Sequence, residues 1–179
     1  YQKTGIAVVG DLDVVVAHNA VGESATQENL AANSIQVSYG ATGVVTHNQV
    51  DGNQWKGPSN YVATALLIYF TEGLLVEKNI IRGNSDVGIY ELGDSTVVDN
   101  NKVSDIGPDD TTNIYNYDFG IGIWGTGSTA TKNKVSGFDS PLDGTIGEKN
   151  VIPNGPPDRI RPLETRRSIA SGKRVSQRF

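Results

Sequence analysis

The chain has 179 residues, with 21 glycines, 37 % hydrophobic residues and a formal net charge of −5. This length suits one domain with a sizeable core, and the glycine-rich, modestly hydrophobic composition favours many short strands over long helices. The lack of cysteine excludes a disulfide framework, and the sequence contains no apolar run long enough to span a bilayer.

The charge is distributed unevenly along the chain. Residues 158–179 hold seven basic and two acidic residues, whereas residues 1–157 hold eight basic and eighteen acidic residues, a net charge of −10. The acidic body argues against nucleic acid as a partner. We expect the basic end to be a solvated tail, with pairing to the acidic body, to a partner or to a membrane surface as alternatives. No signal peptide precedes the first strand-like phrase, so we expect a mature form or an excised piece.

A repeated pattern organises residues 1–150. Each unit begins with alternating apolar residues, at 6–8, 35–37, 66–68, 89–90 and 121–123. A glycine-containing turn and a second apolar phrase follow, ending in an asparagine with Val or Ile two residues later. The recurrent asparagines are Asn19, Asn48, Asn79, Asn101 and Asn133, at spacings of 29, 31, 22 and 32 residues. Within each unit, the two apolar segments are separated by a nearly constant number of residues, whereas the length of the whole unit varies. This indicates coils of constant size with insertions at one corner.

Short strands of this kind bury an apolar face only when identical turns stack and pair their backbones. The sequence therefore predicts an all-β fold, a single-stranded parallel β-helix of about five coils over residues 1–150. The stretch Gly88–Gly107 is predicted to be one coil with little inserted into it. The recurrent asparagines are predicted to form a structural ladder through their side-chain amides, and to accept the left-handed conformation at a corner. Residues 151–179, rich in proline and basic residues, are expected to be a cap, an arm or disordered.

The pattern G-I-x-V-x-x-G-(x)-V-V-x-x-N-x-V-x-G, from Thr4 to Gly137, resembles the right-handed parallel β-helix repeat proteins of the pectate-lyase-like and NosD-like group. The resemblance implies the right-handed coil and the fold, but no single activity. The leucine-rich pattern and the Gly-Gly-x-Gly-x-Asp calcium repeat are both absent. The Asn-Thr-Asp and Gly-His-Gly motifs of polygalacturonases and the Asp-Pro-His motif of epimerases are also absent.

An aromatic stripe is the principal candidate binding feature. If alternate residues of each first strand face inward, the outward residues form two columns. The first is Ala7, Gln36, Leu67, Gly88 and Gly122, and the second is Val9, Ser38, Tyr69, Tyr90 and Trp124. Three aromatic rings beside small residues would offer a flat face to a sugar ring. The predicted ligand-binding set is Tyr69, Tyr90, Trp124, Gln36, Trp55 and Tyr117. The alternatives are that loops or the tail cover the stripe to complete a core, or that it mediates self-association.

The insertions, at residues 22–34, 52–64, 105–118 and 137–150, are the other candidate region. Paired carboxylates in such loops would suit a glycoside hydrolase, and a cluster such as Asp109 and Asp110 would suit Ca²⁺. Surface acids are more often solubilising, so no catalytic residue and no cofactor is assigned, with Ca²⁺ as the alternative.

Two histidines occupy equivalent places on neighbouring coils. His18 and His47 each precede a ladder asparagine, and stacking would bring them within about 5 Å. Lys78 follows in the same column and no acid completes a ligand set, so a corner column is favoured over a metal site.

We expect a secreted or cell-surface scaffold that binds a polysaccharide or surface polymer through the aromatic stripe and corner loops. One alternative is a polysaccharide lyase, hydrolase or epimerase. Another is a structural module that self-associates through its coil ends or basic tail.

Overall fold

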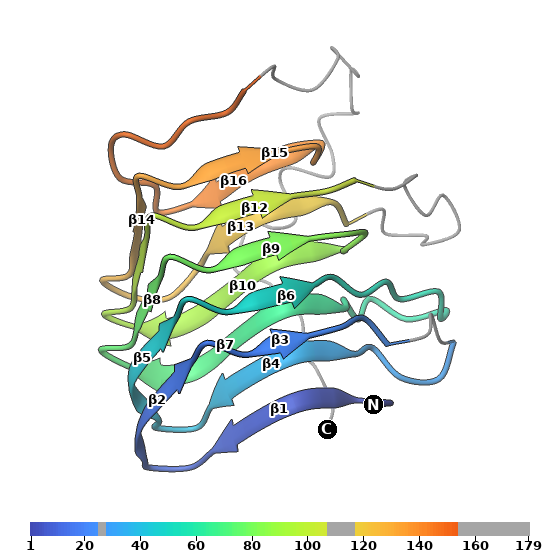
Figure 1. Ribbon diagram of the computed structural model, residues 1–179, viewed down its shortest axis with the longest axis horizontal. Coiled ribbons are helices and arrows are strands. Elements are labelled where there is room, and N and C mark those ends of the chain that lie inside the picture. Colours follow the sequence, from blue (N-terminus) through green and yellow to red (C-terminus); the bar gives the residue numbers. More distant parts are fainter. Residues whose placement is uncertain (25–27, 107–116, 154–179) are drawn as a thin grey trace.

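The computed structural model describes residues 1–24, 28–106 and 117–153 (Figure 1), and within them every regular element is a β-strand. Sheet A contains β1 (Thr4–Val9), β4 (Asn33–Ser38), β7 (Thr64–Glu72), β10 (Val87–Asp94), β13 (Phe119–Ile123) and β16 (Ser140–Gly144). Sheet B contains β2 (Asp13–Ala17), β5 (Thr42–Thr46), β8 (Leu75–Glu77), β11 (Val97–Asp99) and β14 (Thr129–Thr131). Sheet C contains β3 (Ala20–Val21), β6 (Gln49–Asp51), β9 (Ile80–Arg82), β12 (Lys102–Ser104) and β15 (Lys134–Ser136).

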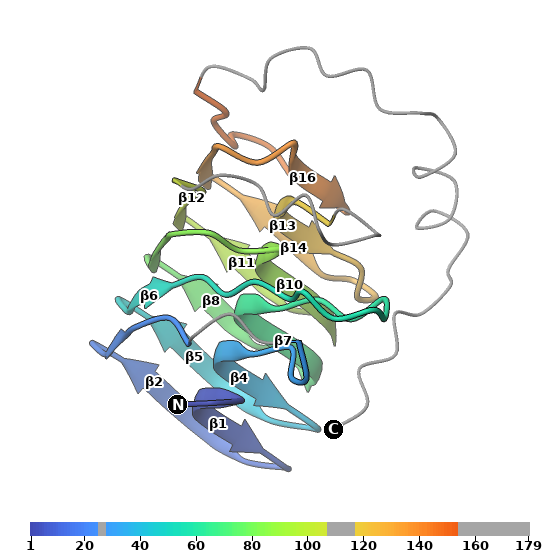
Figure 2. The same cartoon turned by 90° about the vertical axis from the view of Figure 1, so that its right-hand side faces the viewer.

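The chain visits the three sheets in a fixed order. Three consecutive strands, one in each sheet, form a layer that we call a rung and name after its first strand. Each strand pairs in parallel with its counterpart in the next rung, and the rungs stack along one axis (Figure 2). An all-β chain with three parallel, stacked sheets is compatible with the predicted parallel β-helix.

The core is the inside of this stack. Alternation along each strand turns one set of side chains inward, and the registers place these in columns. One column runs Ile6, Ile35, Leu66, Ile89, Ile121 and Leu142 through sheet A, and another runs Val21, Val50, Ile81, Val103 and Val135 through sheet C. Most of these side chains are fully buried. Burial of each Val, Leu or Ile stabilises the fold by about 1.5–3 kcal/mol.

The asparagines singled out in the sequence lie in one column between sheets B and C. The backbone N–H and the side-chain amide of Asn48 both donate to Asn79 Oδ1, at 3.0 and 2.9 Å. Asn79 donates in the same way to Asn101 Oδ1, at 2.9 and 3.0 Å. The same pair of bonds joins Asn19 to Asn48 and Asn101 to Asn133. The column therefore satisfies buried backbone groups at a place where the chain turns.

The column extends one asparagine further than the sequence predicted. Asn133 donates to Asn150 Oδ1 from its backbone N–H at 2.8 Å and from its side chain at 3.1 Å. Ile152 follows Asn150 at the expected spacing, but Gly147 stands where the other units have Val or Ala. The apolar residue of this unit is Ile146, which bridges to Ala130 but stands four residues before Asn150 instead of three, so the sequence pattern does not extend past Asn133.

The residue with the left-handed backbone at each corner is not the ladder asparagine, as predicted, but the residue before it. The residue before each ladder asparagine has a positive φ, namely His18, His47, Lys78, Asn100, Lys132 and Lys149, with φ between 52° and 66°. The ladder asparagines themselves are not among the positive-φ residues. Turning the preceding residue into the left-handed region directs the asparagine N–H along the column, so Asn is required here for its amide and not for its backbone.

The expected boundary at residue 150 falls inside a rung. Val151 forms a parallel bridge with Lys134, so the last rung continues beyond residue 150. The remainder of the predicted tail, residues 154–179, lies outside the described residues, as do Asp109 and Asp110.

Candidate functional site

The predicted columns on the outside of sheet A are out of register at β10. Tyr90 lies opposite Leu67 on one side and Gly122 on the other, and Leu92 lies opposite Tyr69. Tyr90 therefore belongs to the Gln36 column, and the predicted Tyr69–Tyr90–Trp124 column is wrong. The cause is Glu91. It is aligned with Ile68 and Ile123 and is fully buried at an inward position, where the sequence pattern predicts an apolar residue.

Tyr69 and Tyr90 do not form an open face. They are 8 % and 5 % exposed and pack with Leu67, Val87 and Phe119 in a second apolar cluster. Burial is the main cause that raises the pKa of the Tyr90 hydroxyl above its ordinary value. The expectation of three exposed rings is thus corrected. The alternation of β7 and β10 predicted which residues point outward, but not that this side of sheet A would be covered.

The remaining predicted residues divide between this cluster and the loops. Tyr117 and Trp124 pack against the cluster and are partly buried. The Trp124 indole lies over Gly122, where an added Cβ would come within 2.0 Å of the ring, and its N–H donates to Asp143 at 2.9 Å. Gln36 is 5 % exposed and donates to the Ser38 hydroxyl at 3.1 Å. Its amide therefore has an internal partner.

Trp55 is separate from the stripe. It is 3 % exposed and packs with Ala31, Ala63 and Tyr61 in a third cluster. The buried Asp86 carboxylate accepts hydrogen bonds from the Trp55 backbone N–H at 3.1 Å and from the Ala63 N–H at 2.8 Å. Trp55 and Asp86 thus fold the insertion of residues 52–63 against the body, which is a structural role.

An exposed aromatic pair, not singled out in the sequence, lies at the turn from sheet A to sheet B. Tyr39 and Phe70 are each 41 % exposed and their ring centroids are 6.0 Å apart. Tyr39 directly follows β4 and Phe70 lies near the end of β7. They occupy equivalent places, since the Tyr39 N–H donates to Tyr69 O and the Gly40 N–H to Phe70 O. The two rings therefore sit side by side on neighbouring rungs.

Both residues hold an unfavourable backbone conformation. Tyr39 and Phe70 have φ of 59° and 53°, a region that costs a bulky L-residue about 1–2 kcal/mol. The β1 rung places Gly10, with φ of 115°, at the corresponding point. A glycine would relieve the strain at Tyr39 and Phe70 as well. The same left-handed conformation occurs at the residues before the ladder asparagines, so it is a recurrent feature of the turns in this fold.

Three acidic residues lie at backbone positions near this aromatic pair. Asp11 lies beside Gly40, and Glu72 and Asp94 lie opposite each other on β7 and β10. All three are exposed. We call Tyr39, Phe70, Asp11, Glu72 and Asp94 the aromatic corner. The two rings can be located from the strand register: Ser38 is aligned with Tyr69, and Tyr39 and Phe70 are the residues that directly follow them.

The two histidines stack as expected. The His18 and His47 ring centroids are 5.2 Å apart with an interplanar angle of 25°, and Thr46 Oγ1 lies 2.7 Å from His47 Nδ1. Within residues 1–24, 28–106 and 117–153, no group of three or more His, Asp or Glu side chains is arranged to hold a metal ion. The same part of the chain contains no helix with the length and apolarity to cross a membrane.

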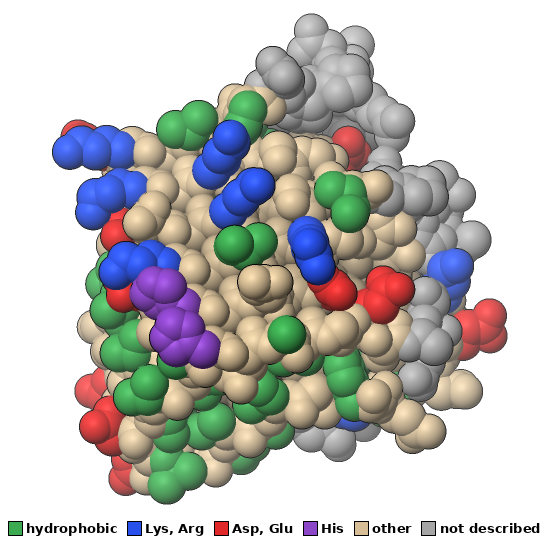
Figure 3. All heavy atoms as spheres, in the orientation of Figure 1, with side chains coloured by type: hydrophobic (Ala, Val, Ile, Leu, Met, Phe, Trp, Pro, Cys, Tyr) green, Lys and Arg blue, Asp and Glu red, His purple; other side chains and the backbone are tan. Residues whose placement is uncertain are grey.

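Basic residues gather on the face formed by sheet C (Figure 3). Lys102 and Lys134 lie opposite each other on β12 and β15 and are exposed. Arg82 pairs with Asp51 at 3.2 Å and Lys132 pairs with Asp99 at 3.1 Å. Like charges directly opposite each other on neighbouring strands repel, so the Lys102–Lys134 pair lowers the stability of the folded state.

Comparison with known proteins gives no match: no family model, no curated protein and no solved structure matches the chain. A functional assignment must therefore come from the surface itself.

Proposed function

We propose that this protein is a right-handed parallel β-helix that binds a carbohydrate polymer at the aromatic corner, outside the cell or on its surface. The resemblance of the repeat and the handedness of parallel crossovers support the right-handed coil. The rungs from β1 to β13 would be its five complete coils, and the residues from β16 to Val151 would begin a sixth.

The observation that carries the binding proposal is the exposed Tyr39–Phe70 pair. The C–H-bearing face of a sugar ring stacks on an aromatic face, which presents negative charge density. Two rings on neighbouring rungs, 6.0 Å apart, offer adjacent contacts to consecutive sugars of an extended chain. Carboxylates bordering the rings accept hydrogen bonds from sugar hydroxyls, a role that suits Asp11, Glu72 and Asp94.

The polymer would be largely neutral. The three acids around the rings are exposed and the corner contains no basic residue among Gly10–Leu12, Tyr39–Ala41, Phe70–Gly73 and Asp94–Ser95. An acidic polymer would be repelled at this site. The residues that contact the polymer are then the exposed Tyr39 and Phe70, and not the buried Tyr69 and Tyr90.

A binding panel with matched variants tests this function. Purified protein is assayed against immobilised neutral and acidic polysaccharides, and Phe70→Ala is compared with Ile80→Ala. These two side chains are 41 % and 43 % exposed, but Ile80 lies on sheet C. We expect Phe70→Ala to weaken binding to a neutral polymer about tenfold, the equivalent of about 1.4 kcal/mol of ring contact, and Ile80→Ala to leave it unchanged. Equal binding by both variants would contradict the proposal.

A polysaccharide-degrading enzyme is the second candidate. It is favoured by one observation, the register pairing of the exposed Glu72 and Asp94 beside the rings, because glycosidases use two neighbouring carboxyl groups. Incubation with each bound polymer followed by product analysis separates the two functions. Release of shorter chains that is lost in both Glu72→Gln and Asp94→Asn would support the enzyme.

A further inference from the structure

The interior of the stack is open at the β1 rung. From β4 to β13 the inward side chains of sheet A are sealed, and Ile35, Val37 and Ile121 are fully buried. In the β1 rung the corresponding Ile6 and Val8 are only half-buried, as are Val14 and Val21. Among the described residues, no strand pairs with the outer edges of β1, β2 and β3. This end therefore presents apolar side chains together with free strand edges.

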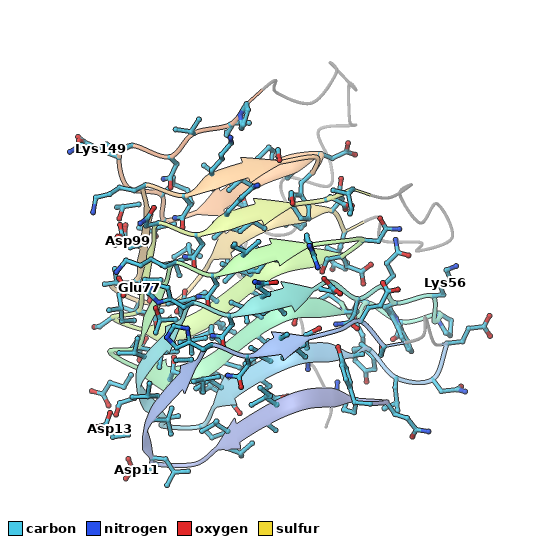
Figure 4. The ribbon with its side chains drawn as sticks, viewed as in Figure 1. Asp11, Asp13, Lys56, Glu77, Asp99 and Lys149 are labelled. Carbon is cyan, nitrogen blue, oxygen red and sulfur yellow. The ribbon has the colours of Figure 1, made fainter. Side chains whose placement is uncertain are left out.

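The exposed surface of the same rung also contains apolar side chains, beside Asp11 and Asp13. Val9, Leu12 and Val15 are 54 %, 52 % and 76 % exposed. Figure 4 places Asp11 and Asp13 at this end of the stack and Lys149 near the opposite end. An open strand edge beside exposed apolar side chains is a template for another chain.

The asparagine ladder has a direction. Each asparagine donates its backbone N–H and side-chain amide to the Oδ1 of the next, so Asn19 uses its donors on Asn48. Within the described chain, Asn19 Oδ1 receives no hydrogen bond. The β1 end therefore presents the acceptor of a ladder unit without its donor.

In the described part of the chain, the opposite end of the stack presents a ladder donor without its acceptor. Asn150 Oδ1 accepts from Asn133, while its side-chain amide turns back to Ala130 O at 2.9 Å and Gly147 O at 3.0 Å. The Asn150 backbone N–H has no acceptor among the described residues. Leu142 of β16 is half-buried, and it continues the inward column that begins at Ile6. This end therefore repeats the surface that each rung offers to the next.

We propose that a second copy of the chain docks head to tail, with its β16 end against the β1 end of the first. The Asn150 N–H of one copy donates to Asn19 Oδ1 of the other, and Leu142 packs against Ile6. Pairing two β1 ends through a two-fold axis would instead bring two ladder acceptors together. A head-to-tail contact of this kind is heterologous, so it builds chains of copies and not a closed dimer.

Complementation between two blocked variants tests this contact. Ile6→Lys places a charge at the β1 end and Leu142→Lys places one at the β16 end, both at half-buried positions where a lysine stem reaches solvent. Ala7→Lys is the matched control, because Ala7 is the next residue on β1 but points outward. Circular dichroism and cooperative unfolding establish that each variant is folded.

Sedimentation velocity gives the readout. Wild type and Ala7→Lys are expected to gain mass with concentration, from monomer through dimer to longer species. Ile6→Lys and Leu142→Lys are each expected to stay monomeric, and an equimolar mixture of the two is expected to form a heterodimer, since each retains one intact end. If Ile6→Lys does not fold, Asn19→Ala removes the ladder acceptor and is expected to weaken association.

Two results would overturn the proposal. One is a wild-type protein that sediments as a monomer at every concentration up to the submillimolar range. The other is self-association of Leu142→Lys alone, which would mean that β1 ends pair with each other. Neither result bears on carbohydrate binding, because the aromatic corner is unaltered in all of these variants.

Discussion

The Ser128 hydroxyl donates a 3.0 Å hydrogen bond to Glu91 Oε1 and so joins the β13 rung to the β10 rung from inside the fold. The same carboxylate accepts from the Gly93 N–H at 2.8 Å and, through Oε2, from the Gly125 N–H at 3.2 Å. Glu91 thus ties the end of β10 to the turn that follows β13. A fully buried acid is tolerated here because several donors surround it.

Glu91 predicts a pH dependence of stability. Burial, the largest cause, raises the pKa of Glu91 above its ordinary value of 4.5, against the opposing effect of its hydrogen bonds. The folded state therefore holds the Glu91 proton more tightly than the unfolded chain does. Its contribution to stability is present below about pH 4.5 and is lost as the pH rises through the folded-state pKa. We expect the difference in unfolding free energy between wild type and Glu91→Gln to shift in favour of Glu91→Gln over that pH range.

Urea unfolding at a series of pH values measures this difference, and Asp99→Asn is the control. The Thr131 hydroxyl is the main cause that lowers the pKa of Asp99 below its ordinary value of 3.8. Its contribution to stability is therefore present above pH 3.8 and is lost as the pH falls further, through the folded-state pKa. A difference between wild type and Glu91→Gln that stays constant with pH would show that Glu91 has an ordinary pKa.

The asparagine column predicts a graded loss of stability. Asn79 is 1 % exposed, accepts from Asn48 and donates to both Asn101 Oδ1 and Val45 O. Asn79→Ala leaves the Asn48 N–H buried without its acceptor, at about 1–3 kcal/mol, and removes one donor from the Val45 carbonyl. Asn19→Ala, at the half-buried end of the column, should cost about 1 kcal/mol because Asn19 Oδ1 has no donor within the described chain.

Denaturant unfolding of both alanine variants gives the comparison. Equal losses for Asn79→Ala and Asn19→Ala would mean that position in the column has no influence, which would contradict the ladder as the source of stability.

The Lys102–Lys134 juxtaposition predicts a stabilising substitution. These like charges face each other on β12 and β15, so Lys134→Glu should raise the unfolding free energy by about 0.2–1 kcal/mol. Lys134→Gln, which removes the repulsion without adding attraction, should give a smaller gain. Both gains should shrink in high salt, where exposed charges are screened. Thermal unfolding at low and high salt checks this, and a gain that persists unchanged in high salt would exclude an electrostatic cause.

The repeat could be recognised from the sequence because stacking imposes the same demand on every rung. Val45, Val76 and Val98 must all be apolar, and Asn48 and Asn79 must both supply an amide, so the pattern recurs at each level. Glu91 interrupted the alternation in β10, and this shifted the expected position of Tyr90. A buried acid satisfied by Gly93, Gly125 and Ser128 cannot be anticipated from alternation, because two of these partners, Gly125 and Ser128, come from the next rung.

The candidate site was less accessible to sequence reasoning. Alternation places Tyr69 and Tyr90 on the outside of sheet A, but it carries no information about what covers that side. Tyr39 directly follows β4 and Phe70 lies near the end of β7, and both have a left-handed backbone that interrupts the alternation, so alternation does not predict their exposure. Their alignment became evident only with the parallel register of β4 and β7.

The most direct test of the aromatic corner is an NMR titration of the isotope-labelled protein with a soluble oligosaccharide of the neutral polymer selected by the binding panel. The account predicts saturable shift changes centred on Tyr39, Phe70 and the neighbouring Asp11, Glu72 and Asp94, with Trp124, Asp143 and the sheet C lysines unaffected. Shift changes centred on Trp124 and Asp143 with none at Tyr39 and Phe70 would contradict it.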